Sequence, residues 1–190
     1  ENSSDVNSTV GNAAEGDGGN VEISANILEV NNESLLSTGT FGSGNAGKVI
    51  IQTQSSVRFE NASVVGSSVG FDAEGRGGNI EISTNTLEVN NESQLTASTF
   101  GMGSAGNLLL QVGDQILLDN SGLFVASVSN SPAGNIELTS GEVQLENNSV
   151  LSAISTTVDG GNLLLNLDTL VLLRDGSQIT ATAGSAQTGG

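Results

Sequence analysis

Short apolar stretches alternate with polar ones along the whole chain, and within each stretch the apolar residues recur at every second position. A spacing of two is the period of a β-strand, whereas an amphipathic helix needs spacings of three and four, which no long segment shows. In the first complete repeat the pattern predicts three short strands, at roughly Asn20–Ser24, Ile27–Asn31 and Leu35–Thr38. The chain is therefore expected to be all-β.

The pattern recurs six times, and two small residues mark each copy. A glycine ends a Gly-Gly or Ala-Gly pair at intervals of 28, 31, 28, 28 and 27 residues, and a serine follows it after 15 or 16 residues. The repeat glycines are Gly19, Gly47, Gly78, Gly106, Gly134 and Gly161. The repeat serines are Ser34, Ser63, Ser93, Ser121, Ser149 and Ser177. Periods of this size are typical of solenoids, in which consecutive units stack.

Five positions of each repeat are apolar when the copies are aligned on these two residues. They lie two and four residues after the glycine, six and four before the serine, and two after the serine. Of the 30 positions, 29 are aliphatic or Phe in a chain that is 36% hydrophobic, and Gln115 is the exception. A three-stranded unit cannot bury its apolar side alone, but stacked units can. The alignment predicts a right-handed parallel β-helix with three strands per rung and about six rungs, roughly 29 Å long.

The positions between the apolar ones support this register. Three residues after the glycine, glutamates alternate with aliphatic residues, so that like charges lie two rungs apart. This column reads Glu22, Ile50, Glu81, Leu109, Glu137 and Leu164. In the second strand, Arg58 falls between Glu29 and Glu88, an opposite-charge arrangement that favours strand pairing. Odd and even rungs therefore differ in a two-rung pattern.

The predicted turns are marked by Asn or Asp two residues before each repeat serine. These side chains tolerate left-handed backbone and form hydrogen bonds within their own turn. The turn residues are Asn32, Asn61, Asn91, Asp119, Asn147 and Asp175. The repeat serine itself is interpreted as a turn residue, because it has no neighbouring base that could activate it.

The chain reads as one elongated domain in two parts. Residues 1–17 are interpreted as a partial N-terminal rung, with Asn7–Val10 aligned to Asn61–Val64, and residues 18–190 as the six-rung segment. Neither end carries the polar capping unit that a solenoid needs. We therefore expect the segment to belong to a longer array.

The amino-acid composition counts against several kinds of partner and chemistry for this chain. The formal net charge is −17 with only four basic residues, which argues against binding to nucleic acid or to anionic membranes. No stretch reaches the 18 or more apolar residues of a membrane helix, so membrane insertion is not expected. There is no cysteine and no histidine, which removes disulfides and the commonest general base and transition-metal ligand.

The repeat motif also resembles a known family. Three segments are similar to repeats of filamentous-haemagglutinin-type exoproteins: Gly77 followed by Gly-Asn-Ile-x-Ile at Gly78–Ile82, Leu-x-Val-x-Asn-x-Ser-x-Leu at Leu87–Leu95, and Thr-Phe-Gly-x-Gly-x-Ala-Gly at Thr99–Gly106. Such repeats are especially common in large cyanobacterial surface proteins. The resemblance implies a right-handed parallel β-helix, two-partner secretion through an outer-membrane transporter, and a role in adhesion. It also implies a secreted or cell-surface location, with glycans or other cell surfaces as partners. The family's N-terminal secretion domain is absent, so the segment would be repeat shaft.

Two other functions remain open from the residues alone. β-Helices also carry polysaccharide lyases and hydrolases, which use clustered carboxylates; here Asp72 with Glu74, and Glu15 with Asp17, are the paired candidates. The same loops could bind calcium weakly in a surface-layer component. Solvated loops are the preferred interpretation, so we expect no catalytic residue, no cofactor and no metal.

One surface feature could bind a partner. The outward aliphatic residues are expected to form an apolar stripe on two adjacent sheets. Its members are Ile50, Leu109, Leu164, Ile116 and Leu172. Each is interleaved with polar residues, so isolated exposed side chains are the simpler interpretation. The sequence thus predicts a structural shaft or adhesin segment.

Overall fold

The computed structural model describes residues 3–128, 130–156 and 159–184, and within them it contains β-strands and connecting turns but no helix. It therefore contains no helix long and apolar enough to cross a membrane. The thirteen strands are β1 (Asp5–Val10), β2 (Val21–Val30), β3 (Leu35–Thr40), β4 (Val49–Phe59), β5 (Val64–Val69), β6 (Ile80–Asn90), β7 (Gln94–Thr99), β8 (Leu108–Asp119), β9 (Gly122–Ser127), β10 (Ile136–Glu146), β11 (Val150–Ser155), β12 (Leu163–Leu173) and β13 (Gln178–Thr182).

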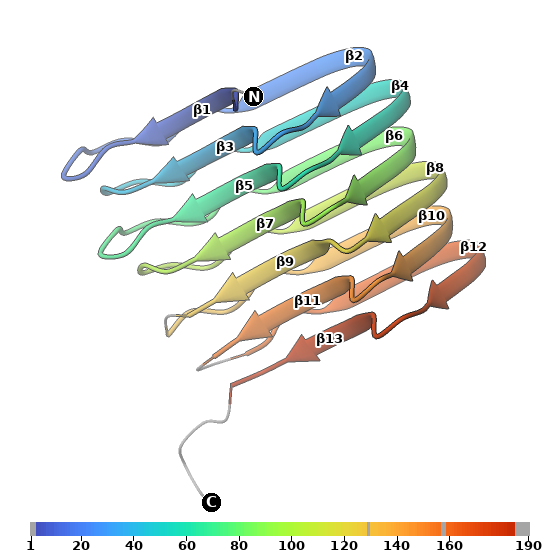
Figure 1. Ribbon diagram of the computed structural model, residues 1–190. Helices are drawn as coiled ribbons and strands as arrows, with labels where there is room; N and C mark the ends of the chain where they lie inside the picture. Colours follow the sequence, from blue (N-terminus) through green and yellow to red (C-terminus); the bar gives the residue numbers. More distant parts are fainter. Residues whose placement is uncertain (1–2, 129, 157–158, 185–190) are drawn as a thin grey trace, which may run out of the picture.

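The strands form two parallel sheets that wind into a β-solenoid (Figure 1). The odd-numbered strands make a seven-stranded sheet in the order β1-β3-β5-β7-β9-β11-β13, and the even-numbered strands make a six-stranded sheet from β2 to β12. Each strand pairs with the strand two places along the chain. Val21 pairs with Val49, and Leu36 with Val65, as the repeat alignment predicts. The predicted parallel β-helix of about six rungs is confirmed.

The rung differs from the prediction in one respect, because its first two predicted strands are one continuous strand. β2 runs through both Asn20–Ser24 and Ile27–Asn31, and every even-numbered strand is similarly long. All five pairings in this sheet show a register irregularity midway, for example between Ala25 and Ile27. Each long strand therefore bends at the irregularity without being interrupted. The two sheets predicted from its two segments are consequently two halves of a single sheet.

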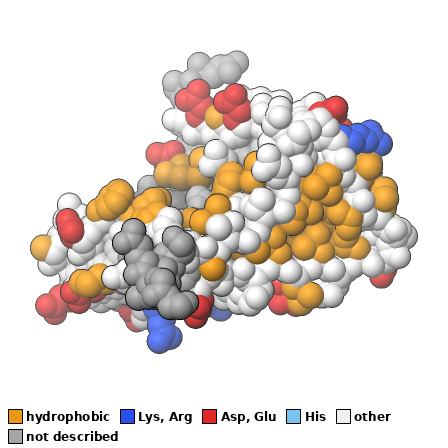
Figure 2. All heavy atoms as spheres, turned by 90° about the horizontal axis from the view of Figure 1, so that it is seen from below, with side chains coloured by type: hydrophobic (Ala, Val, Ile, Leu, Met, Phe, Trp, Pro, Cys, Tyr) orange, Lys and Arg blue, Asp and Glu red, His pale blue; other side chains and the backbone are white. Residues whose placement is uncertain are grey.

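The predicted apolar columns form the core. In the middle rungs their side chains are fully buried, as in Ile51, Val57, Leu87 and Leu123. In the end rungs the core columns are less covered, because the end strands have a neighbour on one side alone: most of those in β2 are half-buried, and Val171 and Leu173 of β12 are exposed. Figure 2 views the molecule from the β13 end and shows hydrophobic side chains gathered over this last rung, where Val171 and other core-column residues are exposed.

The one polar exception in the core columns was a misalignment. Ile116 pairs with Leu87 and Leu118 pairs with Val89, whereas Gln115 pairs with Thr86 on the outer surface. β8 has one extra residue at its bend, and the turn that follows it is one residue shorter. Because these two changes cancel, the glycine-to-serine distance stays at 15 and conceals the shift. With this correction all 30 core-column positions are apolar.

The turn before each repeat serine has left-handed backbone. Asn32, Asn61, Asn91, Asn147 and Asp175 have φ between 51° and 58°, as predicted. In the shortened turn Asn120, with φ of 47°, takes this role in place of the predicted Asp119. The conformation suits Asn and Asp, which populate it more readily than most residues.

The repeat serine links each turn to its own rung and to the preceding rung. The Ser149 hydroxyl donates to the Glu146 carbonyl at 2.6 Å and accepts the backbone N–H of Ser121 at 3.2 Å. Ser63 donates in the same way to the Glu60 carbonyl, and Ser93 accepts the backbone N–H of Ser63. After the shortened turn, Ser121 instead donates to the Val89 carbonyl of the preceding rung at 2.6 Å. The predicted structural role of this serine is confirmed.

The serine ladder also corrects the alignment of the first rung. The hydroxyl of Ser34 accepts from the backbone N–H of Ser4, and Asp5 pairs with Leu35. Ser4 is therefore the equivalent of the repeat serines, and the alignment of Asn7–Val10 with Asn61–Val64 was wrong. The segment contains only two aliphatic residues, Val6 and Val10, among polar ones. So few apolar positions are compatible with more than one alignment to the later rungs.

Candidate functional site

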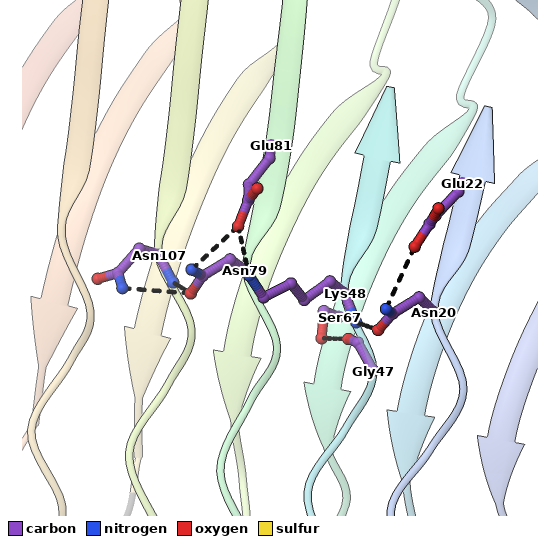
Figure 3. A network of polar contacts seen from close by, with 8 residues as sticks. All are labelled: Asn20, Glu22, Gly47, Lys48, Ser67, Asn79, Glu81 and Asn107. Carbon is purple, nitrogen blue, oxygen red and sulfur yellow. Dashed lines mark hydrogen bonds and ion pairs between the residues drawn. The ribbon is translucent and has the colours of Figure 1, made fainter. Parts of the chain in front are cut away.

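Polar side chains at equivalent positions of neighbouring rungs form ladders of hydrogen bonds along the solenoid. Asn107 donates its backbone N–H to the side-chain oxygen of Asn79 at 3.0 Å, and Asn135 donates in the same way to Asn107 at 2.8 Å. These asparagines directly follow repeat glycines. Lys48 takes the place of asparagine in its rung, donates its backbone N–H to Asn20 and pairs its ammonium with Glu81 at 2.9 Å (Figure 3). These side chains hold adjacent rungs together.

The predicted charge columns are confirmed in register. Glu22 pairs with Ile50 and Ile50 with Glu81, and the alternation continues to Leu164. Arg58 lies between Glu29 and Glu88, and it forms its ion pairs with Glu88 at 3.0 Å and with Glu60 at 3.6 Å. These side chains are a third to a half exposed, so each pair contributes at most about 1 kcal/mol.

The predicted apolar stripe is not continuous. Ile50, Leu109 and Leu172 are half-buried on the outer surface and Leu164 is 49% exposed, each with a polar or charged residue beside it in its column. Ile116 lies in the core with no exposed surface, so its placement on the outer surface was wrong. The reason is the extra residue at the bend of β8, which turns each following side chain to the opposite side of the sheet.

The paired carboxylates lie on connections between the two sheets. Asp17 accepts hydrogen bonds from the backbone N–H and side chain of Asn45, at 2.7 and 3.1 Å, which is a structural role. Glu15, Asp72 and Glu74 are exposed. Across residues 3–128, 130–156 and 159–184 no three acidic side chains converge closely enough to hold a metal ion.

An exposed aromatic cluster lies on the same connections, and sequence reasoning missed it. We call it the aromatic edge and define it as Phe41, Phe71, Phe100 and Met102. All four side chains are exposed, Phe71 by 74%. The ring centroids of Phe71 and Phe100 lie 5.2 Å apart in a tilted arrangement, and the Phe41 ring lies against Gly70 of the next rung.

The aromatic edge follows from the stacking of unequal loops. Five residue steps separate Val69 from Glu74, whereas three separate Thr99 from Met102, although Glu74 and Met102 pair as a bridge. The longer loop carries Phe71 outward, beyond Gly70, toward Phe100. Three of the five phenylalanines of the chain fall beside a glycine in these loops, a signal that was visible in the sequence.

The fold defines the class of this protein as a parallel β-solenoid. Searches against family models, curated proteins and solved structures gave no match to the chain.

Proposed function

We propose that this chain is a stiff shaft segment of a secreted or cell-surface exoprotein of the filamentous-haemagglutinin type, which supports or mediates adhesion. The observation that carries the proposal is the stacking of five apolar columns in register from rung to rung, with hydrogen bonds between repeat serines of several neighbouring rungs. Every strand between the two ends is hydrogen-bonded on both sides, so local opening would expose core and break two ladders at once. Such a rod resists bending and proteolysis, which suits a surface structure.

Adhesive contact would fall on the aromatic edge. Contiguous exposed apolar side chains are a common mark of interaction sites, whereas isolated ones are not. Exposed carboxylates Asp72 and Glu74 neighbour the rings and would repel sulfated or uronic-acid glycans. A neutral glycan can place the C–H face of a sugar against Phe71 and donate its hydroxyls to these carboxylates. The proposed partner class is therefore a neutral glycan on another cell surface.

The adhesion proposal is tested on a glycan array with the 190-residue chain. Neutral glycans should be retained, and replacing Phe71 and Phe100 together with Ala should lower their retention at least tenfold. Ile27→Ala removes an equally exposed apolar side chain elsewhere and should change nothing. Equal binding by all three proteins would contradict the proposal. Cleavage of a polysaccharide that is abolished by Asp72→Asn or Glu74→Gln would favour the enzyme alternative.

The export proposal needs a separate experiment. The chain is placed downstream of the recognition domain of a two-partner system, in cells that carry the matching outer-membrane transporter. We expect the chain to reach the cell surface and to resist added protease there, whereas an unfolded control protein is degraded. Retention in the periplasm with a working transporter would contradict this route.

A further inference from the structure

The outer face of the seven-stranded sheet has a regular ladder and carries no charged side chain from β3 to β13; Asp5 of β1, which pairs with Leu35, adds one carboxylate at the edge of the sheet. None of the six pairings in this sheet shows a register irregularity, whereas all five in the other sheet do. The residues that point outward from β3 to β13 are Leu35, Ser37, Gly39, Val64, Gly66, Ser68, Gln94, Thr96, Ser98, Gly122, Phe124, Ala126, Val150, Ser152, Ile154, Gln178, Thr180 and Thr182. We call this set the flat face.

The absence of charge on the flat face contrasts with the rest of the chain. The outer face of the six-stranded sheet carries Glu22, Glu81 and Glu137 in one column and Arg58 and Glu88 in another. The whole chain has 21 acidic and four basic residues. Two copies of such a molecule repel each other in most orientations. The flat face is the surface on which they can meet with no buried charge.

Four hydroxyls of the flat face are hydrogen-bonded to one another. The hydroxyls of Thr96 and Ser98 share a hydrogen bond at 2.8 Å, and Thr180 donates to Ser152 at 3.0 Å. Ser98 and Ser152 are already buried by their neighbours. Covering a hydroxyl is costly chiefly when it loses its hydrogen bond, and these hydroxyls keep theirs. These four hydroxyls can therefore be covered by a partner at little cost.

We propose that the flat face is a self-association surface, on which a second copy of this chain packs face to face about a two-fold axis. Six strands span about 29 Å along the solenoid, and six residues span about 20 Å along each strand. Two such faces together bury about 1,200 Å², which is just above the roughly 1,000 Å² of a specific interface. Small side chains at most positions let the two sheets approach closely. The pairing goes beyond adhesion, since it would join shafts side by side.

The experiment measures the oligomeric state of the 190-residue chain by sedimentation across about 1 μM to 1 mM protein. The expected result is a monomer–dimer equilibrium with Kd of about 1–100 μM, an affinity suited to a small interface. Salt should tighten it, because screening weakens the repulsion between the two acidic copies.

Matched variants locate the surface. Thr96→Glu places a charge near the centre of the flat face and should raise Kd at least tenfold. Thr139→Glu makes the same change at an exposed strand position on the other sheet and should leave Kd unchanged. Circular dichroism and melting of both variants show whether they fold as the parent does.

A crosslinking experiment does not depend on a charged substitution. The chain has no cysteine, so Thr96→Cys and Thr139→Cys each provide a single thiol. A short bismaleimide should couple two copies through position 96 and not through position 139. The proposal would be overturned if the chain stayed monomeric at the highest concentration. It would also be overturned if Thr139→Glu weakened the dimer as much as Thr96→Glu does, or if crosslinking occurred only through position 139. A monomer whose flat face instead binds a neutral glycan would overturn it too.

Discussion

At the scale of single residues, glycine and serine keep their places for different physical reasons. The repeat glycine sits where two rungs approach most closely: a Cβ at Gly106 would overlap the carbonyl oxygen of Gly78, and the same holds at the other repeat glycines after the first. The repeat serine is kept for its hydroxyl, which at Ser149 donates to the Glu146 carbonyl and accepts the Ser121 N–H at once. The regular spacing of these residues therefore has two physical causes: a steric requirement at the glycine and a hydrogen-bonding requirement at the serine.

The steric requirement predicts a large difference between two glycines. Gly106→Ala should lower the free energy of unfolding by about 4 kcal/mol or more, because the backbone of the preceding rung at Gly78 must move. Gly66→Ala should change it by no more than about 1 kcal/mol, since its new Cβ would meet the Thr96 methyl group at an ordinary 3.7 Å. Urea denaturation of both variants measures the difference. Similar losses at the two positions would contradict the close approach of the rungs.

At the scale of elements, the long strands absorb changes in length at their bends. The rungs that begin at Gly47, Gly106 and Gly161 each carry one more residue at the bend than the neighbouring rungs, and the core columns on either side stay in register. In β8 the extra residue is compensated by a shorter turn, which hid it from an alignment based on Gly106 and Ser121. Irregular pairing at the bend confines each insertion to a few residues.

The register of β8 can be tested by truncating neighbouring side chains. Ile116→Ala removes a fully buried side chain and should cost about 2–5 kcal/mol of unfolding free energy. Leu117→Ala, one residue along and half-buried on the outer surface, should cost about 1 kcal/mol or less. Thermal or urea unfolding gives both values. The opposite order would restore the original alignment, in which Leu117 belonged to the core.

At the scale of the whole molecule, charge and stacking oppose each other. Stacking places each acidic column along the same line of a narrow rod, while Lys48, Arg58 and Arg174 form ion pairs with glutamates of neighbouring rungs. With 21 acidic and four basic residues, most carboxylates cannot have a basic partner of their own. Net repulsion therefore lowers the stability that the core provides.

This balance predicts that salt stabilises the fold. Raising ionic strength from about 0.01 to 0.15 M shortens the Debye length from about 30 to 8 Å. We expect a gain of about 1 kcal/mol, or about 2–4 °C in Tm, for a chain of this length. Replacing the unpaired Glu92 and Glu137 with Gln should reduce the dependence. A fall in Tm with salt would mean that the ion pairs outweigh the repulsion.

The sequence by itself determined the strand period, the six rungs, the parallel stacking and nearly every core column, because each rung repeats the same local pattern beside its neighbour. Tertiary structure decided the rest. It showed that two predicted strands are one bent strand and that Ile116, not Gln115, enters the core, since compensating changes in length leave the spacing unaltered. The aromatic edge and the flat face also needed coordinates. Both surfaces are made of residues about one rung apart in the sequence, which become neighbours only when the rungs stack. The local spacing of apolar residues does not predict which outward side chains then lie together.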